Sequence, residues 1–395
     1  MKFLLIYVPN LRFNNNPYKK YNLYEFATRV TRKNKDNVSN LPLTISAQYG
    51  LVDQVSFFNK TVASKDMSGY YLLKNGEFAY NKSYSNDYPW GAIKRLDLYN
   101  MGCLSTLYIC FKSNDNIVNS NYLVHYFESP KWHKQVADIA GEGARNHGLL
   151  NIAVNDFFNT KHAVPTIENQ IKIARFLDLI EERIQTQIKI IDDYMTYRNA
   201  IVDYFFESLS SDWNRIKLSN ILKEYSELHV KDNSIVHATL SKEGIFPKTD
   251  RYDRDFLVKD EDKKYKVTHL NDICYNPANP KFGVITRNTI GDCIISPIYV
   301  TFKIENGFLP KFVELLVTRK RFISRARKYE QGTVYERMAV NSSDLLSMYV
   351  SIPSLNTQQT IVNIINNIDN KISNEKELLK LYRAQKVYLL KNMFI

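Results

Sequence analysis

The sequence contains two similar segments of 21 residues, and this similarity constrains the fold more than any other feature. The segment "VPTIENQIKIARFLDLIEERI" begins at Val164, and "IPSLNTQQTIVNIINNIDNKI" begins at Ile352, an offset of 188 positions. At the same offset the match continues without a gap to Phe206 and Phe394. The copies share a proline, a glutamine and aromatic ends as well as their apolar period. They are therefore an internal repeat, and not a chance likeness of two amphipathic helices.

Shorter matches extend the repeat into the regions that precede the two segments. The sequence "YYLLKNGEFAYN" (70–81) matches "YKVTHLNDICYN" (265–276), and "CLSTLYICFK" (103–112) matches "IISPIYVTFK" (294–303). The offset drifts from 195 to 188 along the chain, which indicates small deletions in loops between persistent apolar elements. The predicted organisation is a first block (1–160), a central helix (161–210), a second block (211–350) and a C-terminal helix (351–395).

Each block is predicted to be a mixed α/β fold with its own core, since about 150 residues suffice for a domain. The runs "CLSTLYICF" and "IISPIYVTF" are β-branched and aromatic, which predicts strands. The residues "NGE" and "LND" predict turns into the following strands. A helix is expected at the same place in each copy, from "NYLVHYFESPKWHKQVAD" and from "PKFVELLVTRKRFISRARKY".

The two repeated segments are predicted to be long helices that pair as an antiparallel coiled coil. Pro165 and Pro353 stand just before them, where a missing N–H costs little. Apolar residues recur at alternating steps of three and four, which is typical of a coiled-coil seam. The alternative is two separate helices, each lying on its own block. The seam residues are Ile173, Leu177, Ile180, Ile184, Ile188, Ile191, Met195, Val202 and Phe205, and Ile361, Ile365, Ile368, Ile372, Leu379, Tyr382, Leu389 and Met393.

Charge and cysteine usage narrow the class of protein. The formal net charge is +12, and the excess of Lys and Arg lies mostly in the two blocks. Such blocks suit a polyanion, although solubility alone also explains the charge. The four cysteines form no C-x-x-C pair, which favours a reducing cytoplasm. In the start, "MKFLLIYVPN", the apolar run is too short for the hydrophobic region of a signal peptide and no small-residue cleavage site follows, so a buried strand is predicted.

The repeated motifs resemble a known family. Two α/β blocks, each followed by a long helix that opens with "P-x-x-x-x-Q", are similar to the DNA specificity subunit of type I restriction–modification systems. The segments "YRNAIVDYFF" and "YRAQKVYLLKNMF", which close the helices, strengthen the likeness. Family proteins often begin each block with a Trp-containing strand. Here "DWNRIKL" fits with Trp213, but the first block has Tyr18 at that place.

The resemblance implies an α+β chain with two target recognition domains, related by a pseudo-twofold axis and separated by the paired helices. Each domain would read one half of a bipartite site in double-stranded DNA. The helices would act as a spacer and as the docking surface for two methyltransferase subunits, and restriction/translocase subunits would join the full complex. S-adenosylmethionine, ATP and Mg²⁺ would belong to those partners, with no cofactor or metal in this chain. The residues assigned to the coiled coil and docking are Gln170, Ile173, Leu177, Ile180, Ile184, Ile191, Gln358, Ile361, Ile365, Ile368, Ile372 and Leu379.

Candidate DNA contacts come from basic, polar and aromatic residues. Phosphates are contacted by Lys and Arg, whereas base edges are read by polar side chains. The segment "TRKRFISRARKY" carries six cations and no acid, and four loops are polar and aromatic, although a solvated helix face and ordinary turns have the same composition. The predicted contacts are Asn81, Lys82, Ser83, Tyr84, Trp90, Arg145, Asn146, Asn276, Asn279, Lys281, Arg319, Lys320, Arg321, Arg325, Arg327, Lys328, Tyr335 and Arg337.

Catalytic motifs are not found in the sequence. "NPANPKF" lacks the P-P-aromatic run and the Gly-rich turn of an adenine methyltransferase, and there is no P-loop. The expectation is a non-catalytic subunit that directs enzymes to DNA. Two alternatives remain: a stand-alone bivalent DNA-binding regulator, and a coiled-coil adaptor that binds acidic proteins without binding DNA. Co-purification with a methyltransferase and retention on DNA separate the three hypotheses.

Overall fold

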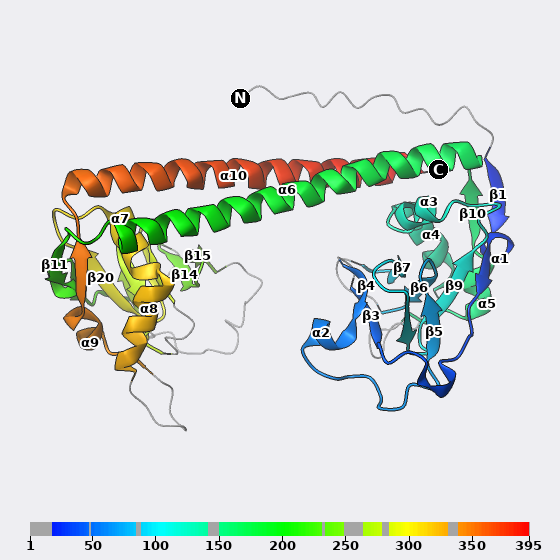
Figure 1. Ribbon diagram of the computed structural model, residues 1–395, viewed down its shortest axis with the longest axis horizontal. Coiled ribbons are helices and arrows are strands. Elements are labelled where there is room, and N and C mark those ends of the chain that lie inside the picture. Colours follow the sequence, from blue (N-terminus) through cyan, green and yellow to red (C-terminus); the bar gives the residue numbers. More distant parts are fainter. Residues whose placement is uncertain are drawn as a thin grey trace. The chain divides into compact units, whose positions relative to one another are not determined.

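The computed structural model describes residues 18–46, 49–83, 88–140, 150–230, 234–248, 264–278, 284–330 and 339–394. It divides into two compact units (Figure 1). The first unit is Met1–Ile188 with Glu377–Ile395, and the second unit is Lys189–Lys376. Each unit therefore contains one block together with parts of both long helices. The strand expected within "MKFLLIYVPN" lies outside the described residues.

The two long helices predicted from the repeat are confirmed. Helix α6 (Ile167–Ser208) has 42 residues, and helix α10 (Leu355–Asn392) has 38. The seam positions are buried or half-buried except Met195, whose side chain is 44% exposed. Arg198, seven residues after the buried Ile191, takes the inward place on this part of α6 and pairs with α10. In the part of the chain that is described, no helix combines the length and apolarity that a bilayer crossing needs.

The helices run antiparallel in each unit. In the first unit Arg183 of α6 lies over the Tyr382 ring, whereas Ile173 and Ala174, nearer the start of α6, share a core with Leu390 of α10. The second unit shows the same direction with other residues, since Ile361 and Val362 from the start of α10 share a core with Val202 and Phe206 from the end of α6. The predicted antiparallel pairing is thereby confirmed within each unit.

Ion pairs between the helices follow the repeat. In the first unit Glu181 of α6 accepts from Lys386 of α10 at 2.8 Å. In the second unit Arg198 of α6 pairs with Asp369 of α10. The offset of 188 that defines the repeat carries Glu181 onto Asp369 and Arg198 onto Lys386. The two units therefore hold the same ion pair, with acid and base exchanged between the helices.

The first block has the elements β1 (Lys19–Asn22), α1 (Leu23–Phe26), β2 (Ala27–Arg29), η2 (Lys35–Asn37), β3 (Leu43–Ser46), β4 (Gly50–Asp53), α2 (Gln54–Phe58), β5 (Tyr71–Lys74), β6 (Phe78–Asn81), β7 (Ala92–Arg95), β8 (Met101–Leu104), β9 (Ile109–Ser113), α3 (Ser120–Tyr126), α4 (Pro130–Ile139), α5 (Val154–Phe158) and β10 (Lys161–Val164). Its largest sheet has the strand order β2-β9-β6-β7, with every neighbour antiparallel.

The second block has β11 (Asn214–Lys217), η3 (Leu218–Asn220), β12 (Leu222–Tyr225), β13 (Leu228–Val230), β14 (Val236–Leu240), β15 (Ile245–Pro247), β16 (Lys264–Thr268), β17 (Ile273–Tyr275), β18 (Ile285–Arg287), β19 (Cys293–Ile295), β20 (Val300–Ile304), α7 (Pro310–Thr318), α8 (Lys320–Ala326), η7 (Arg327–Tyr329), α9 (Ser342–Ser347) and β21 (Tyr349–Ile352). Its sheet β12-β20-β17-β18 repeats the order β2-β9-β6-β7, and the pair β11-β21 repeats β1-β10. A further sheet has the order β13-β16-β19-β14-β15.

Two kinds of element are shorter than the sequence predicts. "CLSTLYICF" is not one strand but β8 and β9, because a turn closes where Tyr108 N–H donates to the Ser105 carbonyl at 3.2 Å. The equivalent turn, Tyr299 N–H to the Ser296 carbonyl at 3.1 Å, separates β19 from β20. Each expected block helix is likewise two helices: Pro130 starts α4 after α3, and an extended Arg319 separates α7 from α8.

The two predicted turns are confirmed. Gly76 has a φ of +83° within "NGE", and Asn271 has a φ of +75° within "LND". Glycine and asparagine tolerate this left-handed backbone better than other residues do.

The glutamine of the repeat fastens each long helix to its block. Gln170 is fully buried; its Oε1 accepts the Asn119 N–H at 2.7 Å, and its Nε2 donates to the Pro165 carbonyl at 2.8 Å. Gln358 does the same, accepting from the Leu309 N–H at 3.0 Å and donating to the Pro353 carbonyl at 3.2 Å. Asn119 and Leu309 are the N-cap residues of α3 and α7. The glutamine therefore joins the start of the long helix to the start of a block helix.

Replacing Lys386 by Met is expected to lower the free energy of unfolding by about 2 kcal/mol, because two half-buried carboxylates lose their shared ammonium. Lys386 Nζ lies 2.9 Å from Glu128 and 2.8 Å from Glu181. Burial raises the pKa of Glu128, but Lys94 and Lys386 outweigh burial and hold the pKa at about 2. The stability from ionised Glu128 is therefore complete above pH 4.5 and is lost as the pH falls toward 2.

Urea unfolding at neutral and acid pH, followed by circular dichroism, measures both effects. In the Lys386→Met protein the acid loss should be smaller and should end at a higher pH, because the folded-state pKa of Glu128 moves toward 4.5. The matched control is Lys380→Met, since Lys380 lies on the same helix and its side chain is 78% exposed. An equal loss of stability in the two variants would contradict the role given to Lys386.

Candidate nucleic-acid interface

The predicted DNA contacts are only partly within the described structure. Asn81, Lys82, Ser83 and Trp90 are described in the first block, and Asn276 and the basic segment 319–328 are described in the second. Outside the described residues lie Tyr84, Arg145, Asn146, Asn279, Lys281, Tyr335 and Arg337.

The same asparagine turn opens a predicted reading loop in both blocks. Asn81 is the last residue of β6, and its Oδ1 accepts the N–H of Ser83 at 3.0 Å. Asn276 directly follows β17, and its Oδ1 accepts the N–H of Ala278 at 3.0 Å. An asparagine that binds the backbone two residues ahead ends a strand and begins a turn. The two loops thus leave equivalent strands in the same way.

In each unit the ends of two predicted loops meet. The N–H of Leu150, which follows the loop containing 143–147, donates to the Lys82 carbonyl at 2.9 Å. In the second unit the N–H of Val340, which follows the loop containing 332–337, donates to the Pro277 carbonyl at 3.1 Å. Loops that are about 60 residues apart in sequence are therefore anchored side by side, as one composite surface needs.

Two equivalent tyrosines each bind a residue at the end of a predicted loop, although the two loops are not equivalent. The Tyr80 hydroxyl donates to the Trp90 carbonyl at 2.8 Å, and the Tyr275 hydroxyl donates to the Val340 carbonyl at 2.9 Å. Burial raises the pKa of both tyrosines, so each hydroxyl stays protonated and remains a donor. Trp90 is itself half-buried against the first core. These residues position the loops, and the sequence alone did not indicate that role.

The basic segment, predicted as one cluster, is divided by the structure. Arg319, Arg321 and Arg325 lie around a hollow beside the last turns of α6. Arg327 and Lys328 lie at the other end of α8, in η7, just before the loop that contains Tyr335 and Arg337. Only this second group adjoins a predicted reading loop in sequence.

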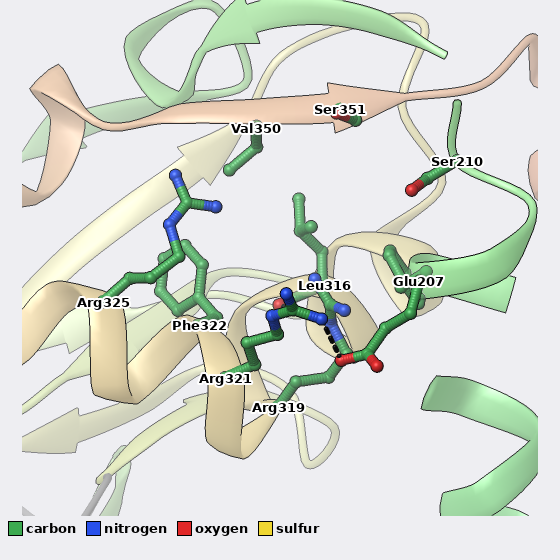
Figure 2. Close-up of a pocket in the computed structure, with 10 residues that line it drawn as sticks. Glu207, Ser210, Leu316, Arg319, Arg321, Phe322, Arg325, Val350 and Ser351 are labelled. Atoms are coloured by element: carbon green, nitrogen blue, oxygen red, sulfur yellow. Dashed lines mark hydrogen bonds and ion pairs between the residues drawn. The ribbon is translucent and has the colours of Figure 1, made fainter. Parts of the chain in front are cut away.

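The hollow, called here the arginine hollow, has a volume of about 270 Å³. It is lined by Phe206, Glu207, Ser210, Leu316, Arg319, Arg321, Phe322, Arg325, Val350 and Ser351, which come from α6, α7, α8, β21 and the segments beside them. Figure 2 shows the side chain of Arg321 directed toward Glu207, while the guanidinium of Arg325 lies near Val350. One carboxylate thus faces three guanidinium groups.

Each arginine of the hollow has a partner within the second unit. Arg319 lies over the Phe206 ring at 4.0 Å, Arg321 pairs with Glu207 at 2.7 Å, and the Arg325 guanidinium donates to the Tyr349 carbonyl at 2.7 Å. Burial lowers the pKa of Arg319 to about 10, against the opposite effect of the carboxylates of Asp203 and Glu207. These acids were missed because they stand in α6, far away in sequence. The surplus of acids in 161–210 was the available signal.

In the described parts of both units, no group of three or more His, Cys, Asp or Glu side chains is placed to hold a metal ion. The four cysteines are buried and unbridged. Burial raises the pKa of the Cys110 and Cys274 thiols to about 12. These thiols are therefore packed in cores as neutral groups.

Comparison with known proteins agrees with this architecture. Residues 259–381 match the family described as the type I restriction modification DNA specificity domain. No curated relative matches the sequence. A chain from a structural study of assembly and conformational transition of the type I R-M system is 15% identical, with 95% of this chain and 97% of that chain covered and a TM-score of 0.60. The type I S subunit from M. genitalium is 14% identical, with 97% of each chain covered and a TM-score of 0.51.

These likenesses confirm the resemblance seen in the sequence and the fold class drawn from it. A specificity domain selects DNA and does not catalyse the reaction. Residues 259–381 match the type I restriction modification DNA specificity domain family, and the chain as a whole has a fold similar to that of the type I S subunit.

Proposed function

We propose that this chain reads a bipartite DNA site and directs type I modification and restriction subunits to it. Residues 1–160 and 211–350 are the two target recognition domains, and 161–210 and 351–395 are the helices between them. The observation that supports this best is the pair of equivalent loop anchors, Asn81 with Tyr80 and Asn276 with Tyr275. Two blocks that display equivalent loops suit two half-sites.

The DNA contacts divide into two kinds. Ser83 and Asn276 stand at the bases of the reading loops, where short polar side chains suit hydrogen bonds to base edges. Arg327 and Lys328 adjoin a reading loop and suit phosphate contacts, which position the protein without reading sequence. The Arg327 guanidinium forms an ion pair with Glu330 at 2.8 Å. Lys328 is therefore the simpler residue with which to test a phosphate contact.

The long helices are proposed as the docking surface for two methyltransferase subunits. Their seam residues, except Met195, are buried or half-buried, so a partner would meet the remaining faces. In the first unit α6 exposes Leu179 to 55%, and α10 exposes Leu381 to 55% and Val387 to 66%. Exposed apolar side chains on a helix suit protein contact. S-adenosylmethionine, ATP and Mg²⁺ would be bound by the partners.

Mapping of methylated adenines in a genome with and without this gene tests the function. The expected result is loss of one split methylation motif when the gene is deleted, and its return on complementation. Purification of the tagged chain should also bring down a methyltransferase. A methylation pattern that is identical with and without the gene would refute the proposal and favour a stand-alone regulator.

DNA affinity of the assembled complex is expected to fall steeply with salt. With six to ten phosphate contacts, the loss is about 10³–10⁵ between roughly 50 and 200 mM salt. Lys328→Gln should weaken binding to all sequences alike and reduce the salt slope by about one. The control is Lys223→Gln on β12, an exposed lysine away from the loop anchors. Fluorescence anisotropy across a salt series measures the DNA affinity and the salt slope of each variant. A changed recognition motif in Lys328→Gln would argue against a phosphate contact.

Helix length is expected to set the spacer between half-sites. Four residues inserted after Ile188 in α6 and four after Lys376 in α10, at the boundaries of the units, lengthen both helices by one turn. The added length is about 6 Å. Along a duplex that rises about 3.4 Å per base pair, this should widen the unspecified spacer by one or two base pairs and leave both half-sites unchanged. Methylation mapping gives the spacer directly.

The control for this design is the insertion in α6 alone. This insertion makes one of two antiparallel helices longer than the other. It should therefore weaken the complex and should not give a simple widening of the spacer. A double insertion that keeps the original spacer would show that the helices do not set it.

A further inference from the structure

The arginine hollow lies where the second block packs against the end of its long helix. The first block has an equivalent packing site, and both sites are called here the joint. In each block the second block helix, α4 or α8, meets the last turns of a long helix and the strand before the other long helix. Trp132 of α4 and Phe322 of α8 are equivalent and almost fully buried. The offset here is 190 positions. At that offset Arg319, Arg321 and Arg325 occupy the places of Ser129, Lys131 and Gln135.

The first block shows that the joint itself needs no arginine. Ser129 caps α4 by accepting the Lys131 N–H, and Gln135 accepts the Lys161 N–H at 3.4 Å. In the second block Arg325 donates to the carbonyl of Tyr349 at 2.7 Å, and Tyr349 is the residue equivalent to Lys161. A serine and a glutamine thus complete the same joint in the first unit. The arginines of the second block are therefore an addition to the fold, with a cost in burial for Arg319.

Charge in the hollow is not balanced. Three guanidinium groups and one carboxylate line it, which leaves two positive charges. Arg319 is half-buried, whereas Arg321 and Arg325 are exposed, so an anion can reach the surplus positive charge from solvent. The pKa of Arg319 is lowered to about 10 mainly by burial, while the carboxylates of Asp203 and Glu207 act in the opposite direction.

Hydrogen-bonding capacity also remains. A guanidinium has five N–H donors, while Arg321 and Arg325 each direct only part of theirs to Glu207 and to the Tyr349 carbonyl. The volume of about 270 Å³ leaves room for an anion and several water molecules. The hollow therefore offers converging donors, a positive charge and space.

We propose that the arginine hollow binds a phosphate group. Arginine forks bind phosphate and carboxylate bidentately, but a phosphate monoester carries a charge of about −1.5 to −2 and three acceptor oxygens, which matches the surplus of two better than a single carboxylate does. The source is either a free or terminal phosphate or the backbone diester of DNA. A bound phosphate joins α8 to the end of α6 and to β21, and so stiffens the joint between the second block and its long helix.

Calorimetric titration of the full-length chain with inorganic phosphate, at neutral pH and constant ionic strength, tests the proposal. The test variant carries Arg319→Ser and Arg325→Gln, which are the residues the first block uses at the same joint. Loss of charged hydrogen bonds should weaken phosphate binding by at least about tenfold. The control, Lys223→Gln, removes one positive charge elsewhere in the second unit and should bind phosphate like the original protein.

Three further ligands distinguish the sources. Tighter binding of inorganic phosphate than of dimethyl phosphate identifies a free or terminal phosphate, whereas equal binding, with competition by a DNA duplex, identifies the backbone. Acetate that binds as tightly as phosphate would overturn the proposal in favour of a protein carboxylate. Absence of saturable phosphate binding, or equal binding by the test variant and the original protein, would overturn it too. The proposal does not depend on the DNA-reading function, because neither readout requires a recognised sequence.

Discussion

Antiparallel pairing of α6 and α10 is the constraint on which the rest of the structure depends, because it completes both cores. In the first unit the ring of Phe394, at the end of the chain, lies 5.4 Å from that of Tyr122 in α3. In the second unit Phe206, near the end of α6, lies 5.2 Å from Phe312 in α7. These are equivalent positions of the repeat. Each buried aromatic ring is worth about 1.5–3 kcal/mol, so neither block is fully stabilised without the end of a long helix.

Polar contacts select the arrangement that the apolar contacts stabilise. A coiled-coil seam of isoleucines and leucines tolerates shifts along the helix, whereas a half-buried ion pair does not, because a shift leaves its charges unpaired. Glu181 with Lys386 and Arg198 with Asp369 fix the alignment, one in each unit. Gln170 and Gln358 then set where each helix leaves its block. The polar residues thus set the alignment of the two helices, whereas the apolar seam supplies most of the stability.

The repeat made the architecture predictable, since two copies that keep their apolar elements must keep their topology. The sheets β2-β9-β6-β7 and β12-β20-β17-β18 bear this out. Local patterns were less informative where a turn hid inside an apolar run, as at Ser105. Roles that depend on distant partners were not predictable. The glutamine of the repeat was assigned to the coiled coil and partner docking, and its contact with the N-cap of α3 became visible only in the structure. The basic segment looked free of acids because Glu207 comes from another element.

Equivalent positions have also diverged in an informative way. The asparagine turns and the tyrosines beneath the loops are retained in both blocks, as expected of parts that any reading surface needs. At the three equivalent positions of the joint beside the long helix, one copy has a single cation, Lys131, and the other has three arginines. Comparison of two halves of one chain therefore separates what the fold requires from what one half has acquired.

The first unit consists of two separate stretches of the chain, and this has a consequence for the order in which the two units fold. Synthesis runs from the N-terminus, and domains generally fold as units when their residues have emerged. The second unit, Lys189–Lys376, is one continuous stretch and has all its residues once Lys376 is available. The first unit needs Leu389 and Phe394 for its core. Of the two blocks, the one that is synthesised earlier is thus completed later, because its core waits for residues that follow the whole of the second unit.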